Sequence, residues 1–578
     1  MKNIKENENL SILNHSCAHL LAHAIKNIYP HAKFWVGPVI EEGFYYDIDL
    51  GDDVIKEEDI DKLEKEMKKI SKDGKRIIRR DLTKEEALKE FKGDEYKEDL
   101  INNMTDENIT CYNQGDFTDL CRGPHVETVK ELKHFKLLKV SGAYWKADAN
   151  NKMLQRVYGI CFENEEELQE HVYLLEEAKK RDHRKLGKEL DIFMISEYGP
   201  GFPFWLPNGM TIKNKLEEFW YQEHTKEGYT FINTPIMLSK ELWEISGHWF
   251  NYKENMYTLE IDDKEFAIKP MSCPGAMLVY KNALHSYKDF PLRIGELGLV
   301  HRHEASGALS GLFRVRRFVQ DDAHIFCTEN QIGSEIIKFI NFIDRMYNVF
   351  GLEYRVELST RPEKKYIGEV KTWDKAEKLL EEALIDLKKD YSINPGDGAF
   401  YGPKLDFMVR DALGREWQCG TLQLDMNMPE RFDLTYVDSD GSKKRPIMFH
   451  HVIYGSIERF IGVAIEHFAG AFPLWLSPTQ INIVPVNNEY HLEYSHDILE
   501  RLLKEGFRVT MDDSDEKLSY RMRTSQTMKI PYTLILGDRE RDNKEISYRL
   551  FGSTETSTIG IDEFIDLIKE VIDNKKQL

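Results

Sequence analysis

Hydrophobic and polar positions alternate with a different period in each region of the chain. Apolar residues at helical spacing predict a helix over residues 11–28, and the later stretch GFYYDIDL alternates as a β-strand does. The pattern also predicts a charged amphipathic helix over residues 57–72 and a strand at MLQRVYGICF. Helices and strands mixed in this way indicate an α+β domain over residues 1–162.

A long polar helix is predicted between this domain and the next part of the chain. It runs from residue 164 to about residue 190, opens with the acidic stretch NEEEL and ends with the basic stretch KKRDHRKLGK. Acidic residues at the start and basic residues at the end suit the helix dipole. We interpret residues 163–190 as a linker helix, and a basic handle for a polyanion is the alternative.

The pattern changes twice more toward the C-terminus. From YGPGFPFWLPNG onward, aromatic, proline and glycine residues punctuate many short strands up to about Pro473. From LSPTQINIVPV onward, strands and helices alternate, which is typical of an α/β unit with a mostly parallel sheet. The expected domains are therefore residues 191–474 and residues 475–578.

Composition limits the class of protein. A chain of 578 residues is long enough for about three or four domains. It shows neither the ~18 consecutive apolar residues of a membrane span nor a signal peptide, so no membrane partner is expected. Seven scattered cysteines favour a reducing, cytoplasmic setting. The net charge of −21 argues against indiscriminate nucleic-acid binding but leaves room for a local basic track.

Charged and aromatic residues are concentrated at residues 297–326. A first strand is expected to end in Arg302 and Glu304, and a second is expected to run from Arg314 through Phe326 after a Gly/Ser/Ala loop. Strand alternation places on shared faces Arg302 with Glu304, and then Arg314, Arg316, Phe318, Gln320, Asp322 and His324. Planar guanidinium groups match phosphate oxygens, so the hairpin predicts a phosphate site, with a solvent-exposed charged hairpin as the alternative.

Three further features carry candidate chemistry. A strand, a tight turn and a helix are expected over residues 446–470, with Arg459 in the first turns of the helix, where it can stack on an aromatic base. One candidate set of metal ligands comes in two pairs, each four residues apart, and suggests the corners of a zinc site: His15, His19, Cys121 and His125. A second candidate set lies in three separate polar-aromatic stretches and consists of Cys273, His324 and His450.

The order of these motifs resembles the class II aminoacyl-tRNA synthetases, and specifically the bacterial type of threonyl-tRNA synthetase. The helix from Thr211 with GYTFINTPIM, including Pro235, matches the first class motif, HRHE with RVRRF matches the second, and GSIERF matches the third. The resemblance extends from HSCAHLLAHA to IPYTLILGDRE. Only about fourteen residues precede His15, so the ubiquitin-like domain of many bacterial relatives is expected to be missing.

The resemblance implies an α+β multidomain fold. An N-terminal α+β editing domain would precede a class II catalytic core built on an antiparallel sheet, and a C-terminal α/β domain would bind the anticodon. It also implies one catalytic zinc ion per subunit, held by Cys273, His324 and His450. His450 and His451 are neighbours on a strand, so only one can point into the site, and the family pattern selects His450.

The zinc ion would serve discrimination between amino acids. Three protein ligands leave the fourth coordination position open for substrate. Zinc bound by the amino and hydroxyl groups of threonine would exclude valine, whereas a hydrophobic pocket separates such isosteres by only ~10²-fold. Asp322 is implied as the acceptor for the threonine hydroxyl.

The resemblance also implies an ATP site with Mg²⁺ bridging the phosphates. Arg302 would hold the α-phosphate, Arg314 the γ-phosphate and Glu304 the adenine amino group. Arg459 and Phe318 would sandwich the adenine ring. Further substrate- or ATP-binding positions match Gln320, Asp322, Tyr401, Gln418, Gln423 and Ser456, and active-site positions match His248 and Lys404. His248 is implied near the terminal ribose of tRNA, and an aromatic-packed core histidine is the alternative.

Serine needs a second site, because it carries the same amino and hydroxyl groups and one methyl group discriminates by only a factor of ~10–200. The resemblance places a hydrolytic site in the N-terminal domain, formed by His15, His19, Tyr46, Lys97, Asp119, Cys121 and His125. Helical spacing puts His15 and His19 on one face, toward a cleft closed by TDLCRGPH. Related domains hold zinc with the same quartet, whereas the threonyl family is thought to use water, so the metal question stays open here.

The sequence therefore predicts a threonine–tRNA ligase that edits seryl-tRNA(Thr). Its expected partners are tRNA(Thr), threonine and ATP, and the resemblance implies a homodimer. A synthetase-like RNA-binding regulator without catalysis is one alternative, against which the intact arginines and zinc trio argue. A zinc hydrolase built on the His/Cys quartet is another, but it would leave about two-thirds of the chain unexplained.

Overall fold

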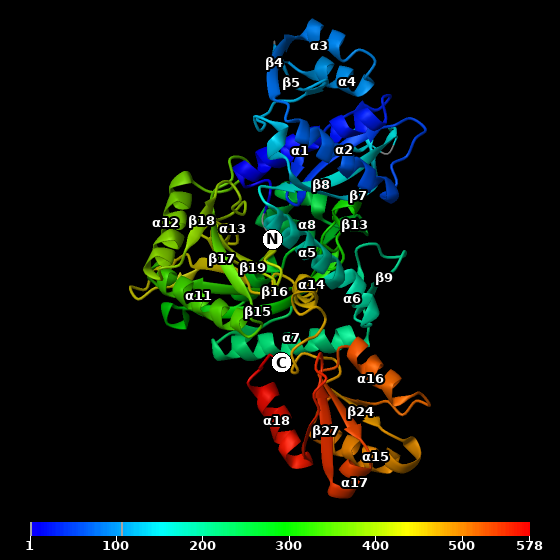
Figure 1. Ribbon diagram of the computed structural model, residues 1–578. Helices are drawn as coiled ribbons and strands as arrows, with labels where there is room; N and C mark the ends of the chain where they lie inside the picture. The colour runs from blue at the N-terminus through cyan, green and yellow to red at the C-terminus, as the bar shows by residue number, and fades with distance from the viewer. Residues whose placement is uncertain (1–2, 106–107, 149, 578) are drawn as a thin grey trace. The chain divides into compact units, whose positions relative to one another are not determined.

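The chain forms two compact units in the computed structural model, which describes residues 3–105, 108–148 and 150–577. The units are Met1–Glu177 and Ala178–Leu578, and their boundary lies within helix α5 (Glu165–Arg181; Figure 1). A second helix, α6 (His183–Glu189), follows directly, and Asp182 accepts a hydrogen bond from the Arg184 backbone N–H. Because this aspartate caps a new helix, the prediction of one continuous linker helix was wrong.

An antiparallel sheet covered by two helices forms the centre of the first unit. Its strand order is β1-β3-β8-β7, with β2 paired to β3. The strands are β1 (Lys33–Phe34), β2 (Val39–Ile40), β3 (Gly43–Asp49), β7 (His134–Tyr144) and β8 (Met153–Phe162). Helices α1 (Glu8–Ile28) and α2 (Ile60–Asp73) share one hydrophobic core with these strands. The helices and strands expected in this region are confirmed.

A smaller α+β layer completes the first unit. Its sheet has the order β4-β5-β6, with β4 (Ile77–Thr83), β5 (Asn108–Gln114) and β6 (Phe117–Leu120). Two short helices, α3 (Lys84–Glu90) and α4 (Glu95–Asn103), belong to this layer, and α3 shares a small core with β4 and β5. Strand β6 also contacts α1. The layer therefore brings the segment after β6 against the helix that carries His15 and His19.

Across the described part of the chain, the largest sheet has eight strands, in the order β11-β15-β16-β23-β20-β19-β17-β18. Neighbours are antiparallel except for β11 with β15 and β17 with β18. The strands are β11 (Thr230–Phe231), β15 (Leu292–His301), β16 (Arg317–Cys327), β17 (Glu353–Ser359), β18 (Tyr391–Asn394), β19 (Lys404–Arg410), β20 (Glu416–Asp425) and β23 (Ile447–Val452). This confirms the expected core built on an antiparallel sheet.

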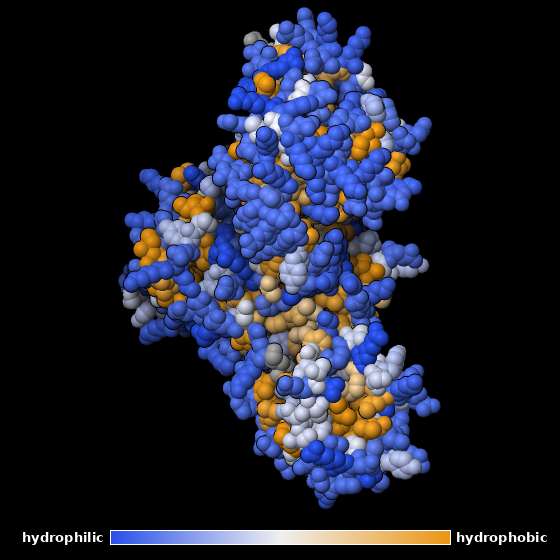
Figure 2. All heavy atoms as spheres, in the orientation of Figure 1, coloured by the Kyte–Doolittle hydropathy of each residue, from blue (hydrophilic) through white to orange (hydrophobic). Residues whose placement is uncertain are grey.

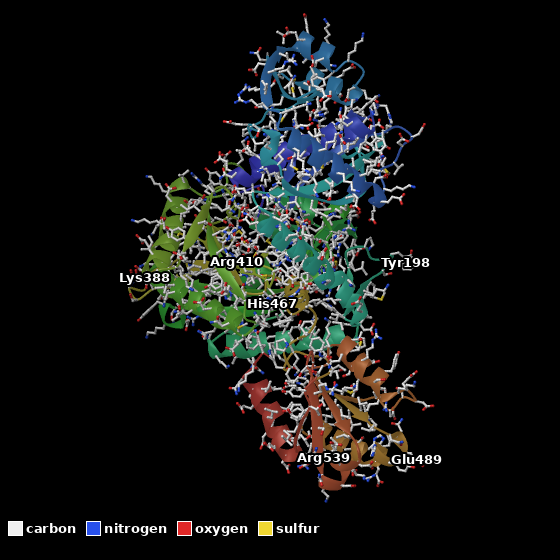
Figure 3. The ribbon with its side chains drawn as sticks, in the orientation of Figure 1. Tyr198, Lys388, Arg410, His467, Glu489 and Arg539 are labelled. Atoms are coloured by element: carbon white, nitrogen blue, oxygen red, sulfur yellow. The ribbon has the colours of Figure 1, made fainter. Side chains whose placement is uncertain are left out.

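The long helices that bury side chains against this sheet are α7 (Pro207–Lys226), α11 (Ile332–Asn348), α12 (Val370–Asp386) and α14 (Ile457–His467). Smaller elements surround them, namely α8 (Lys240–Ser246), α9 (His248–Asn251), α10 (Cys273–Lys281), α13 (Met428–Arg431), β9 (Phe193–Ile195), β10 (Pro203–Trp205), β12 (Met237–Ser239), β13 (Thr258–Ile261), β14 (Lys264–Ile268), β21 (Tyr436–Val437) and β22 (Lys443–Lys444). Tyr198, in the loop between β9 and β10, is 93% exposed and projects outward (Figure 3).

The strand limits of the central hairpin differ from those expected. Strand β15 ends at His301 and β16 begins only at Arg317. Arg302, Glu304 and Arg314 therefore lie in the connecting segment rather than on strand faces. The segment contains a short 3-10 turn at Ser306–Ala308 and a left-handed glycine, Gly311, with φ of +49°. Such turns end strand pairing early, so period-2 alternation does not apply to these arginines.

The C-terminal part of the second unit has its own five-stranded sheet in the described residues, with the order β25-β24-β26-β27-β28. Its elements are β24 (Ile481–Pro485), α15 (Asn488–Lys504), β25 (Val509–Met511), α16 (Leu518–Thr527), β26 (Tyr532–Leu536), α17 (Asp538–Asn543), β27 (Glu545–Leu550), β28 (Ser557–Gly560) and α18 (Ile561–Asp573). Strands β25, β24 and β26 are parallel, whereas β27 and β28 are antiparallel. The α/β alternation is confirmed, but only half of the pairings are parallel, because β27 and β28 follow short connections rather than long crossovers.

The surface shown in Figure 2 is mainly hydrophilic, with hydrophobic residues in separate patches. In the described part of the chain, no helix combines the length and apolar character needed to span a membrane. All seven cysteines lie within the described residues and are free thiols.

Candidate functional site

A cavity of about 420 Å³ in the second unit gathers most of the residues expected to bind substrates. It is lined by Cys273, Arg302, Glu304, Arg314, Phe318, Gln320, Asp322, Tyr401, Gln418, Gln423, His450, Ser456 and Arg459. Strand β16 contributes Phe318, Gln320 and Asp322, and the intervening Val319 belongs to the hydrophobic core. The expected alternation therefore holds within β16, although not before it.

Three charged side chains, Arg302, Glu304 and Arg314, line one part of this cavity. The Glu304 carboxylate accepts hydrogen bonds from Arg314, with the Nη2 atom 2.8 Å away and the Nε atom 2.9 Å away. Arg302 donates from Nε to the Pro270 carbonyl at 3.2 Å and lies 5.2 Å from the centre of the Phe318 ring. Both arginines retain donors that can turn toward a triphosphate.

Arg459 is held by backbone atoms rather than by a carboxylate. Ser456 directly precedes helix α14 as its N-cap, and its side chain accepts from the Arg459 N–H at 3.1 Å. The guanidinium donates to the Phe313 carbonyl at 3.1 Å and to the Gln418 carbonyl at 3.0 Å. Burial lowers the pKa of Arg459 below its ordinary value. A planar cation fixed in this way suits stacking on a base.

The expected zinc trio comes from three elements: Cys273 and His450 line this cavity, whereas His324 is buried beside His450 and does not line it. Cys273 opens α10, while His324 on β16 and His450 on β23 are register partners whose ring centres lie 5.1 Å apart. Among the residues that the structure describes, the buried His324 Nε2 atom has no hydrogen-bond partner, and burial lowers the pKa of this imidazole well below its ordinary value. His450 Nε2 lies 3.0 Å from the Asp425 carboxylate.

His451 points to the other side of the sheet, as expected for the neighbour of His450. Its Nε2 atom lies 2.7 Å from the Tyr229 hydroxyl, and its ring contacts Phe339 within the core.

Burial raises the pKa of the Asp322 carboxyl on the cavity side to about 7, and the nearby His450 opposes this rise. Asp322 Oδ1 lies 3.7 Å from His324 Nε2.

Asp406 is a buried residue of this site that the sequence patterns did not single out. Its carboxylate accepts from Gln418 Nε2 at 2.7 Å and from Thr421 Oγ1 at 2.9 Å, and it pairs with Lys404. Lys404 also pairs with Asp397 at 2.9 Å. The signal available in the sequence was the i, i+2 spacing of Lys404 and Asp406 on β19, which puts both on one face.

Tyr401 and His248 occupy different surroundings. The Tyr401 hydroxyl donates to the Gln423 side chain, and its ring centre lies 5.0 Å from that of His450. His248 is fully buried beside Ser246 and Phe400, and burial lowers its pKa to about 3. It does not line the cavity, and its surroundings match the alternative of a core histidine.

A second cavity, of about 270 Å³, lies in the first unit and gathers the residues expected to edit. It is lined by His15, His19, Tyr46, Lys97, Asp119 and Cys121. His125 lies against it, with its ring centre 4.4 Å from that of His15 and 4.3 Å from that of His19. The ligand atoms of the quartet His15, His19, Cys121 and His125 all lie within 4.8 Å of one another.

The two candidate metal sets differ in compactness. Among the described residues, candidate ligand atoms lie within 4.8 Å of one another in two groups, the quartet of His15, His19, Cys121 and His125 and the group of Asp182, His183 and Glu466. The trio of Cys273, His324 and His450 is not that compact. Hydrogen bonds link three members of the quartet: Cys121 Sγ lies 3.0 Å from His15 Nε2 and 3.2 Å from His125 Nε2.

A buried ion pair lies at the floor of the second cavity. Lys97 Nζ lies 2.6 Å from the Asp119 carboxylate, and both side chains are at most 3% exposed. Burial alone would raise the pKa of Asp119, but Lys97, His19 and the Tyr46 hydroxyl outweigh it and lower the pKa. Burial lowers the pKa of His19 to about 4, so its imidazole is neutral and able to accept a proton.

Cys121 and His125 contact each other as an uncharged thiol and an uncharged imidazole. Burial raises the pKa of the Cys121 thiol to about 12, which disfavours a nucleophilic thiolate near neutral pH. Ser16, which the sequence patterns did not single out, holds His125: its Oγ donates to the Ile12 carbonyl at 2.8 Å and lies 3.1 Å from His125 Nδ1. The hydroxyl then accepts from Nδ1–H, which leaves the His125 Nε2 lone pair toward Cys121.

Three family models match separate parts of the chain. Residues 257–468 match the tRNA synthetase class II core domain (G, H, P, S and T), and residues 480–571 match an anticodon binding domain. Residues 109–158 match the threonyl and alanyl tRNA synthetase second additional domain. Together with the antiparallel core and its arginine-lined cavity, these matches define a class II aminoacyl-tRNA synthetase.

Comparison with individual proteins shows to which family within this class the chain is similar. The chain is 53% identical over 577 residues to the threonine–tRNA ligase of Clostridioides difficile, covering 99% of this chain and 90% of that protein. It is 55% identical over 563 residues to that of Fusobacterium nucleatum, covering 96% and 90%. A structure described as the RNA binding domain of threonyl-tRNA synthetase from Cryptosporidium parvum Iowa II aligns with a TM-score of 0.66 and 40% identity, over 68% of this chain and 98% of that one. The chain belongs to the threonyl-tRNA synthetase family.

Proposed function

We propose that the protein joins threonine to the AMP moiety of ATP as threonyl-adenylate, releasing pyrophosphate, and then transfers the threonyl group to the 3′ end of tRNA(Thr), releasing AMP. The observation that carries this proposal is the single cavity in which Arg302, Arg314 and Arg459 meet Asp322 and Cys273. Guanidinium groups fit a triphosphate, and a buried carboxyl beside metal-ligating side chains fits the polar end of a small amino acid.

The residues divide the work of activation by position. Arg302 neutralises the α-phosphate during attack by the threonine carboxylate, and Arg314 holds the γ-phosphate. Arg459 and Phe318 stack on the adenine ring, and Glu304 accepts from its amino group. Arg314 is paired with Glu304 in the structure. In this arrangement Arg314 therefore contacts the Glu304 carboxylate and the γ-phosphate at the same time. Mg²⁺ accompanies ATP and neutralises the remaining phosphate charge.

Cys273, His324 and His450 would hold a zinc ion, one per subunit in the catalytic core. The fit rests on the donor set of one thiol and two imidazoles and on the buried His324 Nε2 atom, which lacks a hydrogen-bond partner within the described part of the chain. The ion would supply an open position for the amino and hydroxyl groups of threonine. Asp322 accepts a hydrogen bond from the substrate hydroxyl, and Asp425 orients the His450 ring.

The second cavity would hydrolyse seryl-tRNA(Thr). Neutral imidazoles with lowered pKa values, His15 and His19, are suited to accept a proton from water. The Lys97–Asp119 pair provides a fixed charge at the floor of the cavity, which can orient the aminoacyl group. Cys121 remains a thiol, so the reaction uses water rather than a covalent thioester.

Threonine-dependent exchange of pyrophosphate into ATP tests the activation step. Wild-type protein supplied with zinc and Mg²⁺ is expected to exchange, and no exchange would favour the RNA-binding regulator. Cys273→Ser should lose both bound zinc and exchange, whereas the control Cys327→Ala, at a buried free cysteine on β16, should retain both. Full zinc occupancy in Cys273→Ser would move the metal to the His/Cys quartet.

Mischarging tests the editing step separately. His15→Ala combined with His19→Ala should leave threonine charging intact while seryl-tRNA(Thr) accumulates. His134→Ala, at a half-buried histidine paired with Glu165 in the same unit, is the matched control and should edit normally. Mischarging at the wild-type level in the double variant would remove the editing assignment.

The proposal extends to a homodimer in the cytoplasm. Apolar side chains are exposed around the first class motif, including Phe231 at 37%, Ile236 at 41% and Met237 at 44%. A second copy of the chain would bury such a surface. Sedimentation should give a dimer that Ile236→Asp weakens, and a wild-type monomer at micromolar concentration would contradict this part. Seven free thiols support a reducing compartment.

A further inference from the structure

His183 is a buried histidine of the linker whose two ring nitrogens are both engaged. It opens α6 and is 1% exposed. Its Nδ1 atom lies 2.7 Å from a Glu466 carboxylate oxygen, which also accepts from the His183 backbone N–H at 3.0 Å. On the other side of the ring, the Leu312 backbone N–H donates to Nε2 at 3.0 Å. The ring therefore bridges α14 and the segment between β15 and β16.

These contacts fix the tautomer of the imidazole. A carboxylate only accepts hydrogen bonds, so Nδ1 carries the proton and Nε2 keeps its lone pair for Leu312. Asp182, His183 and Glu466 have ligand atoms within 4.8 Å of one another, but neither imidazole nitrogen remains available for a metal. The cluster is accordingly a structural support and not a metal site.

The supported segment is the one that carries Arg314 into the ATP cavity. The Phe313 ring centre lies 4.1 Å from that of His183 and 4.1 Å from that of Trp417. The Phe313 carbonyl accepts from Arg459 Nε at 3.1 Å. Residues 312 and 313 are thus held from the linker by His183 and from the cavity by Arg459, directly before Arg314.

The backbone at Leu312 can approach His183 closely because the residue before it is a glycine, Gly311. Gly311 has φ of +49°, and a Cβ atom there would lie 2.1 Å from His183 Nε2. Only glycine combines this backbone conformation with that contact. The sequence between β15 and β16 is therefore fitted to the histidine at the end of the linker, 129 residues earlier than Leu312.

We propose that His183 and Glu466 are positioning residues for ATP: they hold residues 311–314 so that Arg314 faces the phosphates. Neither residue lines the cavity or would contact the nucleotide. Glu466 lies in the last turn of α14, which ends at His467 (labelled in Figure 3), and Arg459 lies in the first turn of the same helix. The helix that fixes one ATP-binding arginine thereby also fixes the histidine that supports the other. This inference rests on the proposed role of Arg314.

Two variants separate the two hydrogen bonds of the ring. His183→Asn retains an amide N–H near the position of Nδ1 for Glu466, but its side chain is too short to reach Leu312. His183→Gln places a carbonyl oxygen near the position of Nε2 and can accept from the Leu312 N–H. Lys188→Gln, at an exposed position on the same helix, is the control for changes in α6 itself.

The readout is threonine-dependent pyrophosphate exchange on the full chain. An unsatisfied buried N–H group is expected to raise the KM for ATP about tenfold in His183→Asn, while the KM for threonine stays unchanged. His183→Gln should recover most of the ATP affinity. A defect that was merely structural would lower kcat or affect both substrates, and it would not be rescued by glutamine.

Hydrogen exchange of a peptide containing Leu312 provides an independent measurement that does not require activity. Exchange should accelerate in His183→Asn and remain slow in His183→Gln and Lys188→Gln. Equal values of the KM for ATP in the asparagine and glutamine variants, or unchanged exchange at Leu312 in His183→Asn, would overturn the inference. A wild-type protein without threonine-dependent pyrophosphate exchange would instead overturn the proposed function. The two failures can be told apart, because hydrogen exchange at Leu312 can be measured on an inactive protein.

Discussion

The buried Lys97–Asp119 pair gives a prediction whose size and pH dependence follow from the structure. Lys97 Nζ contacts the Asp119 carboxylate at 2.6 Å, the Trp35 carbonyl at 3.0 Å and the Tyr46 hydroxyl at 3.2 Å. Replacing it in Lys97→Met keeps most of the apolar stem and removes the charge. A buried carboxylate remains that keeps the hydrogen bond from Tyr46 but has lost its ion-pair partner, and breaking such a pair costs about 3–5 kcal/mol of unfolding free energy.

The pH dependence has a definite sign. In the wild-type protein the pKa of Asp119 is lowered from 3.8, so its contribution to stability is present above that value and is lost as the pH falls. Without Lys97, burial becomes the dominant cause and raises this pKa. The carboxyl then favours folding at acid pH and opposes it as the pH rises. The cost of Lys97→Met should therefore grow from about pH 4 toward neutrality.

Urea unfolding of the full chain at several pH values measures this cost, and hydrogen exchange of peptides from α1 and β3 assigns it to the first unit. Lys92→Met, at an exposed position before α4, is the matched control and should be close to neutral. Adding Asp119→Asn to Lys97→Met should recover stability, because the unpaired charge is gone. A double variant no more stable than Lys97→Met, or a cost independent of pH, would refute the reasoning.

Three further predictions concern the second unit and the whole reaction. The free energy of unfolding of Asp321→Asn should rise relative to that of the wild type as the pH increases from about 4 to 8, by at most about 4 kcal/mol. Thermal unfolding measures this change, and a Tm difference between the variant and the wild type that is the same at both ends of this pH range would contradict it. The reason is that burial raises the pKa of Asp321 to about 7, so its stabilising contribution is lost on ionisation, whereas asparagine still accepts from the Ile453 and Tyr454 N–H groups. Gly402→Ala should destabilise by about 1–3 kcal/mol and raise the KM for threonine, since the added Cβ would lie 2.0 Å from the Leu424 carbonyl, and a normal KM would argue against it. Added salt should reduce tRNA charging far more steeply than pyrophosphate exchange, and parallel salt slopes would exclude a phosphate-dominated tRNA interface.

The sequence resolved those features that depend on local period. Helical spacing put His15 and His19 on one face of a helix, and the two meet His125 and Cys121 in the structure. Strand alternation separated His450 from His451 and placed Gln320 and Asp322 together within β16. These predictions succeeded because a regular helix or strand fixes side-chain direction by itself.

Predictions failed where capping and turns override the period. The aspartate at position 182 starts a new helix, and the segment from 302 to 316 leaves the sheet before its arginines. A charged helical pattern continues across such a break, and alternation continues across a turn, so neither limit is visible in the pattern alone.

The sequence by itself determined the order of the domains, the family and the two sets of chemical groups, because motifs and periods are local properties of the chain. Only the tertiary structure decided which buried polar groups support them. Asp406 beneath Gln418, Ser16 against His125 and His183 on Leu312 are partners brought together over long or irregular separations. A buried donor or acceptor must be satisfied, but its sequence neighbours do not reveal which distant atom satisfies it. That choice is made when the chain folds.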